Sequence, residues 1–338
     1  MSDDERTKHN ESRNPSPESR PVGQSAPSPE LWSVGDLWAA GRAAHRPVLL
    51  KEALEFLNVR PDGIYIDATL GAGGHAEAIL KVLERGKLLG LDRDPAALAL
   101  ARERLQAFGE KLIVQEGNFA EIDVLHAASG LPPADGMLAD LGLSSMQLED
   151  AARGFSFSLP GPLDMRMDPQ TEKTAEAMVN YSSERDLANL IYQLGEERHS
   201  RRIARALMKA RPIRSTTELA QVVTRAIPSR AGLHQIHPAT RTFMALRLAV
   251  NQELENLEAF LAKGLSVLAP QGRLVILSFH SLEDRPVKRA FQAWRREGRV
   301  RILTRKVVRP SEEEMRANPR SRSAKLRAAE KRELGVGD

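Results

Sequence analysis

The sequence predicts an α/β fold, with a doubly wound, mostly parallel sheet that is interrupted by an all-helical insertion. Short apolar runs ending on Asp67, Asp92 and Asp140 alternate with segments of helical length. This alternation is typical of a parallel sheet with helices on both faces. The alternation stops after Asp140 and resumes only at Gly272, and much of the intervening sequence has helical periodicity.

The first half of the chain predicts a regular series of elements. The apolar runs are expected to be strands, and the amphipathic segments between them are expected to be helices. Pro95 fits the first position of its helix, where a missing N–H costs no hydrogen bond. The expected order is helix 50–58, strand 64–67, helix 75–84, strand 87–92, helix 95–108, strand 111–115, a short helix near 120–127, and strand 136–140.

The second half predicts a loop, a group of helices and the rest of the sheet. Residues 141–165 are expected to be a loop, and residues 172–230 are expected to be helical. One long helix is expected from His237, because apolar residues recur every three or four positions as far as Leu261. The remaining expected elements are strand 272–279, helix 282–294, strand 301–307 and a period-two strand at 323–330.

These elements predict a sheet domain made of residues 45–145 and 237–332, with a helical domain at 146–236 inserted into it. Residues 1–44 are expected to be a disordered tail, because the first thirty are rich in Pro, Ser and charge. Near-helical spacing of apolar residues in 31–44 predicts a short helix within that tail.

Composition limits the possible classes of protein. The chain has 338 residues and no cysteine, which excludes disulfides, thiolate metal sites and a cysteine nucleophile. It has no apolar run long enough for a membrane span and no secretory signal, so we expect a cytoplasmic protein without membrane contact. His45, His75, His237 and His280 show no metal-binding spacing, and no metal is expected.

The segment IYIDATLGAGGH at 64–75 predicts a nucleotide-type cofactor site. Gly71, Gly73 and Gly74 permit positive φ and close approach of a ligand at a helix N-terminus. Asp92 ends the next strand, about 20 residues further on, where a carboxylate suits a ribose diol. The turn fits dinucleotide enzymes and S-adenosylmethionine enzymes alike, and a glycine turn without a ligand is a third interpretation.

The acids at the strand ends extend this site. Parallel strands bring Asp67, Asp92 and Asp140 to one rim of the sheet, and Ser144 and Ser145 follow the last of them. Three such acids could also hold a divalent cation, although each has its own explanation as a strand-end or capping residue.

A basic stripe follows in the helical region. Arg201, Arg205 and Lys209 fall on one face of a helix, opposite Ile203 and Leu207, as expected for contacts with nucleic-acid phosphates. A second basic cluster at 316–332 favours that interpretation, and a solvated helix face is the alternative. An aromatic content of 4% argues against a base-stacking platform.

Several long phrases together resemble the RsmH or MraW family of bacterial small-subunit ribosomal RNA cytosine methyltransferases. The resemblance covers about residues 45–332. The most specific phrases are PDGIYIDATLGAGGH (61–75), ADLGLSSMQLED (139–150), GPLDMRMDP (161–169), HPATRTF (237–243) and SFHSLEDR (278–285).

The resemblance implies a seven-stranded, Rossmann-like S-adenosylmethionine-dependent methyltransferase with an inserted helical domain. It implies methylation of the exocyclic 4-amino group of one decoding-region cytidine of 16S rRNA in the small ribosomal subunit. Carried over by position, the cofactor contacts would be Gly73, Gly74, His75, Asp92, Phe119, Asp140 and Gln147. The family usually has Gln where this chain has Met244. The oligomeric state, monomer or weak homodimer, stays open.

For the chemistry we expect Asp140 to accept or orient the amino group, with Ser144 and Ser145 nearby. A carboxylate of ordinary pKa is a poor terminal base, so the final proton is expected to go to water. The rival functions are a nicotinamide-dependent oxidoreductase and a non-catalytic rRNA-binding assembly factor.

Overall fold

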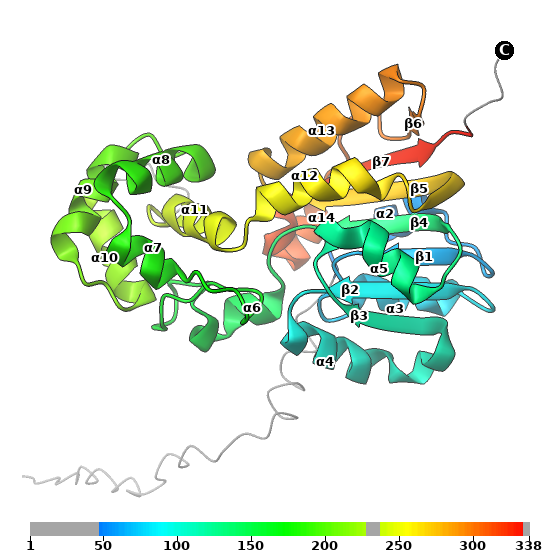
Figure 1. Cartoon of the computed structure of the whole chain (residues 1–338), viewed down its shortest axis with the longest axis horizontal. Helices are drawn as coiled ribbons and strands as arrows, with labels where there is room; N and C mark the ends of the chain where they lie inside the picture. The colour runs from blue at the N-terminus through cyan, green and yellow to red at the C-terminus, as the bar shows by residue number, and fades with distance from the viewer. Residues whose placement is uncertain (1–46, 228–236, 334–338) are drawn as a thin grey trace, which may run out of the picture. The chain divides into compact units, whose positions relative to one another are not determined.

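The computed structural model describes residues 47–227 and 237–333, and the predicted tail with its short helix lies outside them, as does His45. The chain divides into two units, 1–44 and 45–338, and every described residue belongs to the second. That unit is built on one seven-stranded sheet (Figure 1).

The sheet has the strand order β3-β2-β1-β4-β5-β7-β6. The first five strands in this order are parallel, whereas β7 runs antiparallel to both β5 and β6. The strands are β1 (Ile64–Asp67), β2 (Lys87–Asp92), β3 (Leu112–Glu116), β4 (Ala134–Asp140), β5 (Leu268–Ser278), β6 (Val300–Ile302) and β7 (Lys325–Lys331). The predicted doubly wound, mostly parallel fold is confirmed, and the strand order reverses between β1 and β4.

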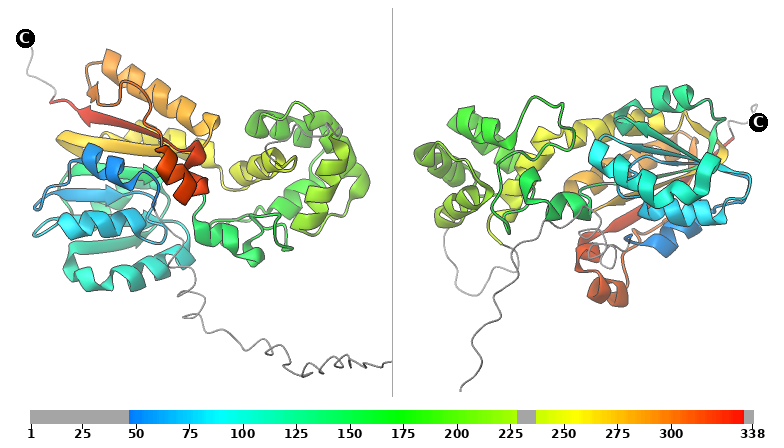
Figure 2. Two further views of the ribbon diagram at one scale, coloured as in Figure 1. Left: turned by 180° about the vertical axis from the view of Figure 1, so that it is seen from behind. Right: turned by 90° about the horizontal axis from the view of Figure 1, so that it is seen from below.

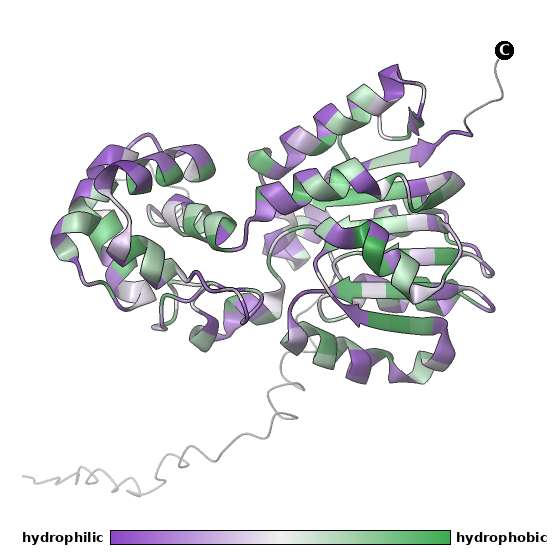
Figure 3. Cartoon of the chain, viewed as in Figure 1, coloured by the Kyte–Doolittle hydropathy of each residue, from purple (hydrophilic) through white to green (hydrophobic). Residues whose placement is uncertain are grey.

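Helices cover both faces of the sheet because alternate strand residues point to opposite sides. One core joins Tyr65, Leu88 and Leu138 to α2 (Leu50–Leu57), α3 (Gly74–Val82) and α4 (Pro95–Leu105). The other joins Ile66, Leu89 and Met137 to α5 (Ile122–Ser129), α12 (Glu253–Gly264) and α13 (Ser281–Arg296). Figure 2 shows the two layers of helices, and Figure 3 shows apolar residues concentrated along the strands between them.

The helical insertion has a hydrophobic core of its own. Its elements are α6 (Ser145–Glu149), α7 (Ala175–Tyr181), α8 (Glu184–Gly195), α9 (Ser200–Ala210), α10 (Thr216–Ala226) and α11 (Thr240–Val250). Leu187, Ile203 and Leu219 lie in this core, and so do Phe243 and Leu246 of α11. We expected the chain to return to the sheet domain at 237, but α11 packs in the core of the insertion. We therefore propose a boundary at 251–252.

The predicted long helix from His237 is wrong, since α11 and α12 are separate helices. Gln252 has a left-handed backbone, with φ of 49°, between them. The side chain of Asn251 donates to the carbonyl oxygens of Met165 and Arg247 and so holds the break in place. An apolar repeat of three to four residues continues across the break, which is why periodicity did not reveal it.

Two other regions differ from the expectation. The predicted loop 141–165 contains α6, which begins with a reciprocal capping box between Ser144 and Gln147, and a 3-10 turn at Ala151–Arg153. The predicted strand 301–307 is only the three residues of β6, and a short helix α14 (Glu312–Ala317) follows. Among the described residues, no helix is long and apolar enough to cross a membrane.

Gly154 provides a test of how tightly the start of the insertion is packed. Its φ is +70°, and a Cβ there would lie 2.0 Å from the carbonyl oxygen of Pro162. Gly130 has a φ of +69° with open space around it, so Gly130→Ala is a matched control. We expect Gly130→Ala to lower the free energy of unfolding by about 1 kcal/mol and Gly154→Ala by about 3 kcal/mol or more, in urea titrations. Equal losses would contradict this packing.

Candidate functional site

The carboxyl ends of β1, β2 and β4 place three aspartates on one rim of the sheet. Asp67 pairs in register with Gly90 of β2 and Leu138 of β4, so Asp92 and Asp140 each lie two residues beyond it on the neighbouring strands. Ligands of open α/β sheets bind at this rim, beside the point where strand order reverses. The candidate site therefore lies at this rim.

The glycine turn lies beside these acids. Gly73 has a φ of 79°, and a Cβ there would meet Leu105 at 2.9 Å, while a Cβ on Gly74 would meet Pro47 at 2.7 Å. Gly73 is the N-cap of α3, and no side chain caps that helix. Backbone N–H groups at the start of α3 are thus left to a ligand, which is the usual arrangement for an anionic group.

Asp92 holds the turn in place. Its Oδ2 accepts from the backbone N–H of Gly71 at 2.8 Å, and its Oδ1 accepts from that of Asp94 at 2.9 Å. Burial raises the pKa of Asp92, against the lowering effect of these two N–H groups. A carboxylate oxygen can accept more than one hydrogen bond, and each oxygen of Asp92 accepts one here. Asp92 therefore keeps acceptor capacity for a ligand hydroxyl.

Asp140 has a buried carboxylate oxygen, Oδ1, that accepts no hydrogen bond from the described residues. Its Oδ2 lies 3.6 Å from Nδ1 of His75, whose Nε2 lies 3.0 Å from the carbonyl oxygen of Val48. Burial, together with the charges of Asp67 and Glu283, raises the pKa of Asp140 well above its ordinary value.

Two further acids, Asp67 and Glu283, contribute to the environment of Asp140. The sequence placed Asp67 on the rim, whereas it did not assign Glu283 to the site. Burial raises the pKa of Asp67 to about 7, and the charge of Asp92 adds to the effect. Glu283 lies in the first turn of α13. Burial would raise its pKa, but contact with His280 and the charge of Arg247 outweigh burial, so its pKa is lowered. His280 Nε2 lies 3.0 Å from Oε1 of Glu283. The phrase SFHSLEDR was the available signal for Glu283 and His280.

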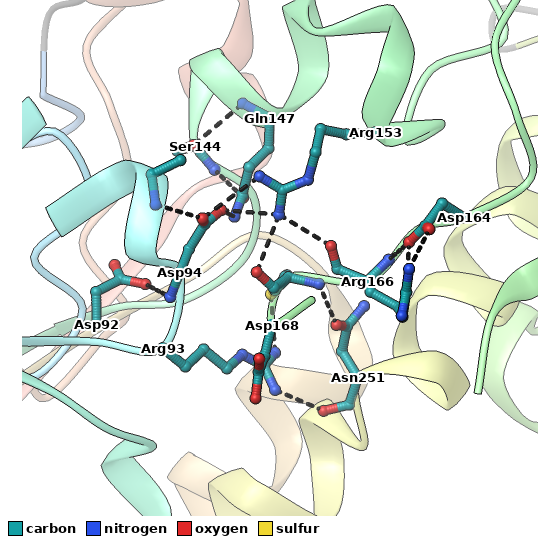
Figure 4. Close-up of polar contacts among 12 residues, drawn as sticks. Asp92, Arg93, Asp94, Ser144, Gln147, Arg153, Asp164, Arg166, Asp168 and Asn251 are labelled. Atoms are coloured by element: carbon teal, nitrogen blue, oxygen red, sulfur yellow. Dashed lines mark hydrogen bonds and ion pairs between the residues drawn. The ribbon is translucent and has the colours of Figure 1, made fainter. Parts of the chain in front are cut away.

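The buried carboxylate of Asp94 connects the sheet to the insertion (Figure 4). It accepts from the backbone N–H of Ala96, from Nε2 of Gln147 at 2.7 Å and from Nη2 of Arg153 at 2.9 Å. The preceding residue, Arg93, makes a second contact of this kind: its Nη1 donates to the carbonyl oxygen of Asn251 at 2.8 Å. The turn after Asp92 therefore contacts the insertion near the place where the chain leaves the sheet, at Gln147 and Arg153, and near the place where it returns, at Asn251.

These contacts bear on four residues that sequence reasoning assigned to the site. Ser144 caps α6, and the Gln147 side chain bonds both Ser144 and Asp94. Ser145 is the first residue of α6. Phe119 packs edge-on against Phe260, with ring centroids 5.2 Å apart. Gln147 thus has a clear architectural role, whereas the cofactor contacts expected of Phe119 and Gln147 and the catalytic roles expected of Ser144 and Ser145 stay predictions.

The predicted basic stripe lies on the exposed side of α9. Arg201, Arg205 and Lys209 are exposed, while Ile203 and Leu207 pack in the helical core. Arg205 is the member with an ion pair, 3.5 Å from Glu184. In the second basic cluster, several cations are paired within the chain: Arg316 with Glu312, Arg320 with Glu149, and Arg327 with Asp284.

Met244 is half-buried in α11. Within 47–227 and 237–333, no group of three or more His, Asp or Glu side chains is arranged to hold a metal ion.

The raised pKa of Asp67 predicts how stability depends on pH. The folded chain keeps a proton on Asp67 up to about pH 7, whereas the unfolded chain loses it near the ordinary value of 3.8. Because the folded state binds the extra proton, this contribution to the free energy of unfolding falls as pH rises from about 4 to about 7. The Asp67→Asn variant cannot undergo this titration. Its free energy of unfolding, measured relative to wild type, is therefore expected to be on the order of 2 kcal/mol higher at pH 8 than at pH 5.

Urea titrations at both pH values measure this difference. Asp62→Asn is the control, since Asp62 is exposed and pairs with Arg85 at the surface. A gain from Asp67→Asn that is the same at both pH values would contradict the assignment.

Comparisons with known proteins agree with the resemblance seen in the sequence. Residues 42–332 match the model of the MraW methylase family. The ribosomal RNA small subunit methyltransferase H of Syntrophobacter fumaroxidans is 52% identical over 306 residues, which cover 85% of this chain and 96% of that protein. The protein of the same name from Koribacter versatilis is 52% identical over 295 residues, covering 85% of this chain and 93% of that protein.

Among solved structures, the fold is similar to an rRNA methylase from Streptococcus thermophilus, with 13% identity and a TM-score of 0.42 over 86% of this chain and all of that one.

Proposed function

The chain belongs to the MraW methylase family, and from this premise we propose that it transfers a methyl group from S-adenosylmethionine to small-subunit ribosomal RNA. The proposed acceptor is the exocyclic 4-amino group of one decoding-region cytidine in 16S rRNA. Family membership favours this function over the nicotinamide-dependent oxidoreductase and the non-catalytic assembly factor. The single observation that carries the chemistry is the buried, unpartnered Oδ1 of Asp140 beside the glycine turn.

The residues of the rim fit the proposed cofactor. At Gly73 the backbone turns into α3 with a φ of 79°, and the uncapped start of that helix offers N–H groups to the carboxylate of a methionine moiety. Asp92 would accept from the ribose hydroxyls, as a carboxylate at this strand end does in related sites. When bound, S-adenosylmethionine supplies an electrophilic methyl group on a sulfonium.

Asp140 is proposed to orient the amino group and to take its proton. The lone pair of a cytosine amino nitrogen is delocalised into the ring, so the group needs to be held in line with the methyl group while an N–H proton is accepted. Oδ1 of Asp140 would take the proton that the amino nitrogen loses on methylation and would later pass it to water, while the sulfonium, having lost its methyl group, would leave as the neutral thioether S-adenosylhomocysteine. An ordinary carboxylate is a poor acceptor, but the raised pKa of Asp140 improves the match.

Asp67 and Glu283 act on Asp140 without touching the substrate in this proposal. The negative charge of each, when it is ionised, raises the pKa of Asp140 and so helps Asp140 to accept a proton. Thr69 fixes the strand end, because its Oγ1 accepts from the backbone N–H of Asp140 at 2.6 Å. We call these positioning residues.

The partner in this proposal is the small ribosomal subunit, which also gives the protein its cytoplasmic location. The exposed cations of α9 are proposed to bind phosphates of the substrate RNA. Label transfer from S-adenosylmethionine to small subunits of cells that lack the native enzyme, with the modified base mapped, tests the function. Labelling of the 4-amino group of one cytidine is expected, and binding without any methyl transfer would refute it.

Asp140→Asn separates chemistry from binding at the rim. The amide keeps the size of the side chain and one acceptor oxygen but cannot take the proton. We expect kcat at saturating cofactor to fall by about 10²-fold or more, with the Kd for S-adenosylmethionine little changed. Steady-state kinetics on small subunits and calorimetry measure the two quantities, with Asp62→Asn as the control. A near-wild-type kcat would remove Asp140 from the chemistry.

The α9 surface is tested by charge removal. Replacing Arg201, Arg205 and Lys209 with Gln should lower the slope of log affinity against log salt for RNA binding by about 2, because three phosphate contacts are lost. The control replaces three exposed cations elsewhere, Lys51, Lys87 and Arg102, with Gln. If the two triple variants change the slope equally, α9 is only a solvated face.

A further inference from the structure

A basic groove lies between α13 and the strands at the edge of the sheet. It is a cavity of about 380 Å³ between α13, β6, β7 and the residues that follow β6 and β7. Its lining includes six cationic side chains and no acidic one: Lys288, Arg295, Arg301, Arg305, Arg327 and Arg332. Such a concentration of one charge attracts an anion.

Internal ion pairs account for only part of this charge. Arg327 is held by Asp284 at 2.7 Å, and Arg301 by Glu330 at 2.9 Å. Within the described residues, the remaining four cations, Lys288, Arg295, Arg305 and Arg332, have no ion pair. These four are exposed, so packing of the core does not explain them either. The groove thus carries an excess of positive charge that the folded chain itself does not balance.

The groove is built on rigid parts of the molecule. Phe291 of α13 and Val300 of β6 line it and are buried in the same core as the sheet. An arginine supplies a planar fork of donors that matches a phosphate, and five of the six cations are arginines. Lys288 and Arg295 are held by α13, and Arg301 and Arg327 by β6 and β7, whereas Arg305 and Arg332 follow those strands.

The groove also has a definite position relative to the catalytic rim. In the strand register, Arg301 of β6 lies opposite Glu330 of β7, and Glu330 lies opposite Arg273, which is near the end of β5 farther from the rim. In the same register, Arg327 of β7 lies opposite Ile276 of β5, which is two residues before Ser278, where β5 reaches the rim. Asp284, which holds Arg327, directly follows Glu283 of the site. The groove therefore runs along the edge of the sheet, from Arg332 at the end opposite to the rim to Arg327 near the rim, and is separate from the glycine turn.

We propose that this groove binds the phosphodiester backbone of the substrate RNA on the side of the target base away from the helical insertion. The inference rests on the proposed function for the identity of the RNA. Four unpaired cations along one groove suit consecutive phosphates of a strand, whereas an isolated phosphate needs fewer. The groove and α9 then hold the RNA on two sides of the reacting base.

The test removes charge from the groove without breaking an ion pair. Lys288, Arg295 and Arg305 are replaced together with Gln, and the variant with Lys51, Lys87 and Arg102 replaced is the matched control. Anisotropy of a labelled RNA fragment around the target cytidine is measured against salt, without cofactor. We expect the groove variant to lose about 2 from the log–log slope and the control to keep the wild-type slope. Thermal melting checks that both variants are folded.

Competition distinguishes a strand from a free anion. Unlabelled RNA and inorganic phosphate are compared as competitors at equal phosphate concentration, and RNA is expected to compete far better. Equal competition, an unchanged slope in the groove variant, or equal slope changes in both triple variants would overturn the proposal. Because no methyl transfer is measured here, failure of the proposed function appears separately, as wild-type protein that binds RNA but labels no cytidine.

Discussion

The buried ion pair between Asp94 and Arg153 is the interaction on which the arrangement of the two domains depends. It links the turn after β2 to the start of the insertion, and the same guanidinium donates to the carbonyl oxygens of Arg166 and Met167. The backbone N–H of Met167 in turn donates to Oδ1 of Asn251, at the return to the sheet domain. Removing one partner of such a buried pair is strongly destabilising, because the other charge is left without compensation. This constraint fixes where the insertion leaves and rejoins the sheet.

The rim shows how a fold can keep carboxyl groups close together. Asp67, Asp140 and Glu283 share a buried environment in which full ionisation of all three would be costly. Contact with His280 and the charge of Arg247 lower the pKa of Glu283, while burial and neighbouring charge raise those of the two aspartates. The pKa values are thus separated: Glu283 gives up its proton most readily, whereas Asp140 takes up a proton more readily than an ordinary carboxylate. This separation is the property that a proton acceptor near neutral pH requires.

Local patterns predicted strands β1, β2 and β4 well, because the apolar run that forms each strand and the aspartate that ends it are adjacent in the sequence. Asp67, Asp92 and Asp140 could be placed on one rim from strand direction alone. The break at Gln252 could not be predicted, since it depends on Asn251 reaching Met165, far away in sequence. For the same reason the sequence did not show that Gln147 bonds Asp94, or that Glu283 on α13 lies close enough to raise the pKa of Asp140. Motif phrases indicated the function, but the environment of each side chain comes from long-range packing.

The pairing of β4 with β5 has a consequence for synthesis of the protein on the ribosome. Ala134 pairs with Leu268, so the whole insertion must be translated before the middle of the sheet can close. The core of the insertion lies within residues 155–250 and needs no strand from the other domain. Domains form as units during synthesis, and contacts between distant residues come late. The helical domain can therefore fold while β4 still has an unpaired edge, which β5 covers only after the whole insertion has been made.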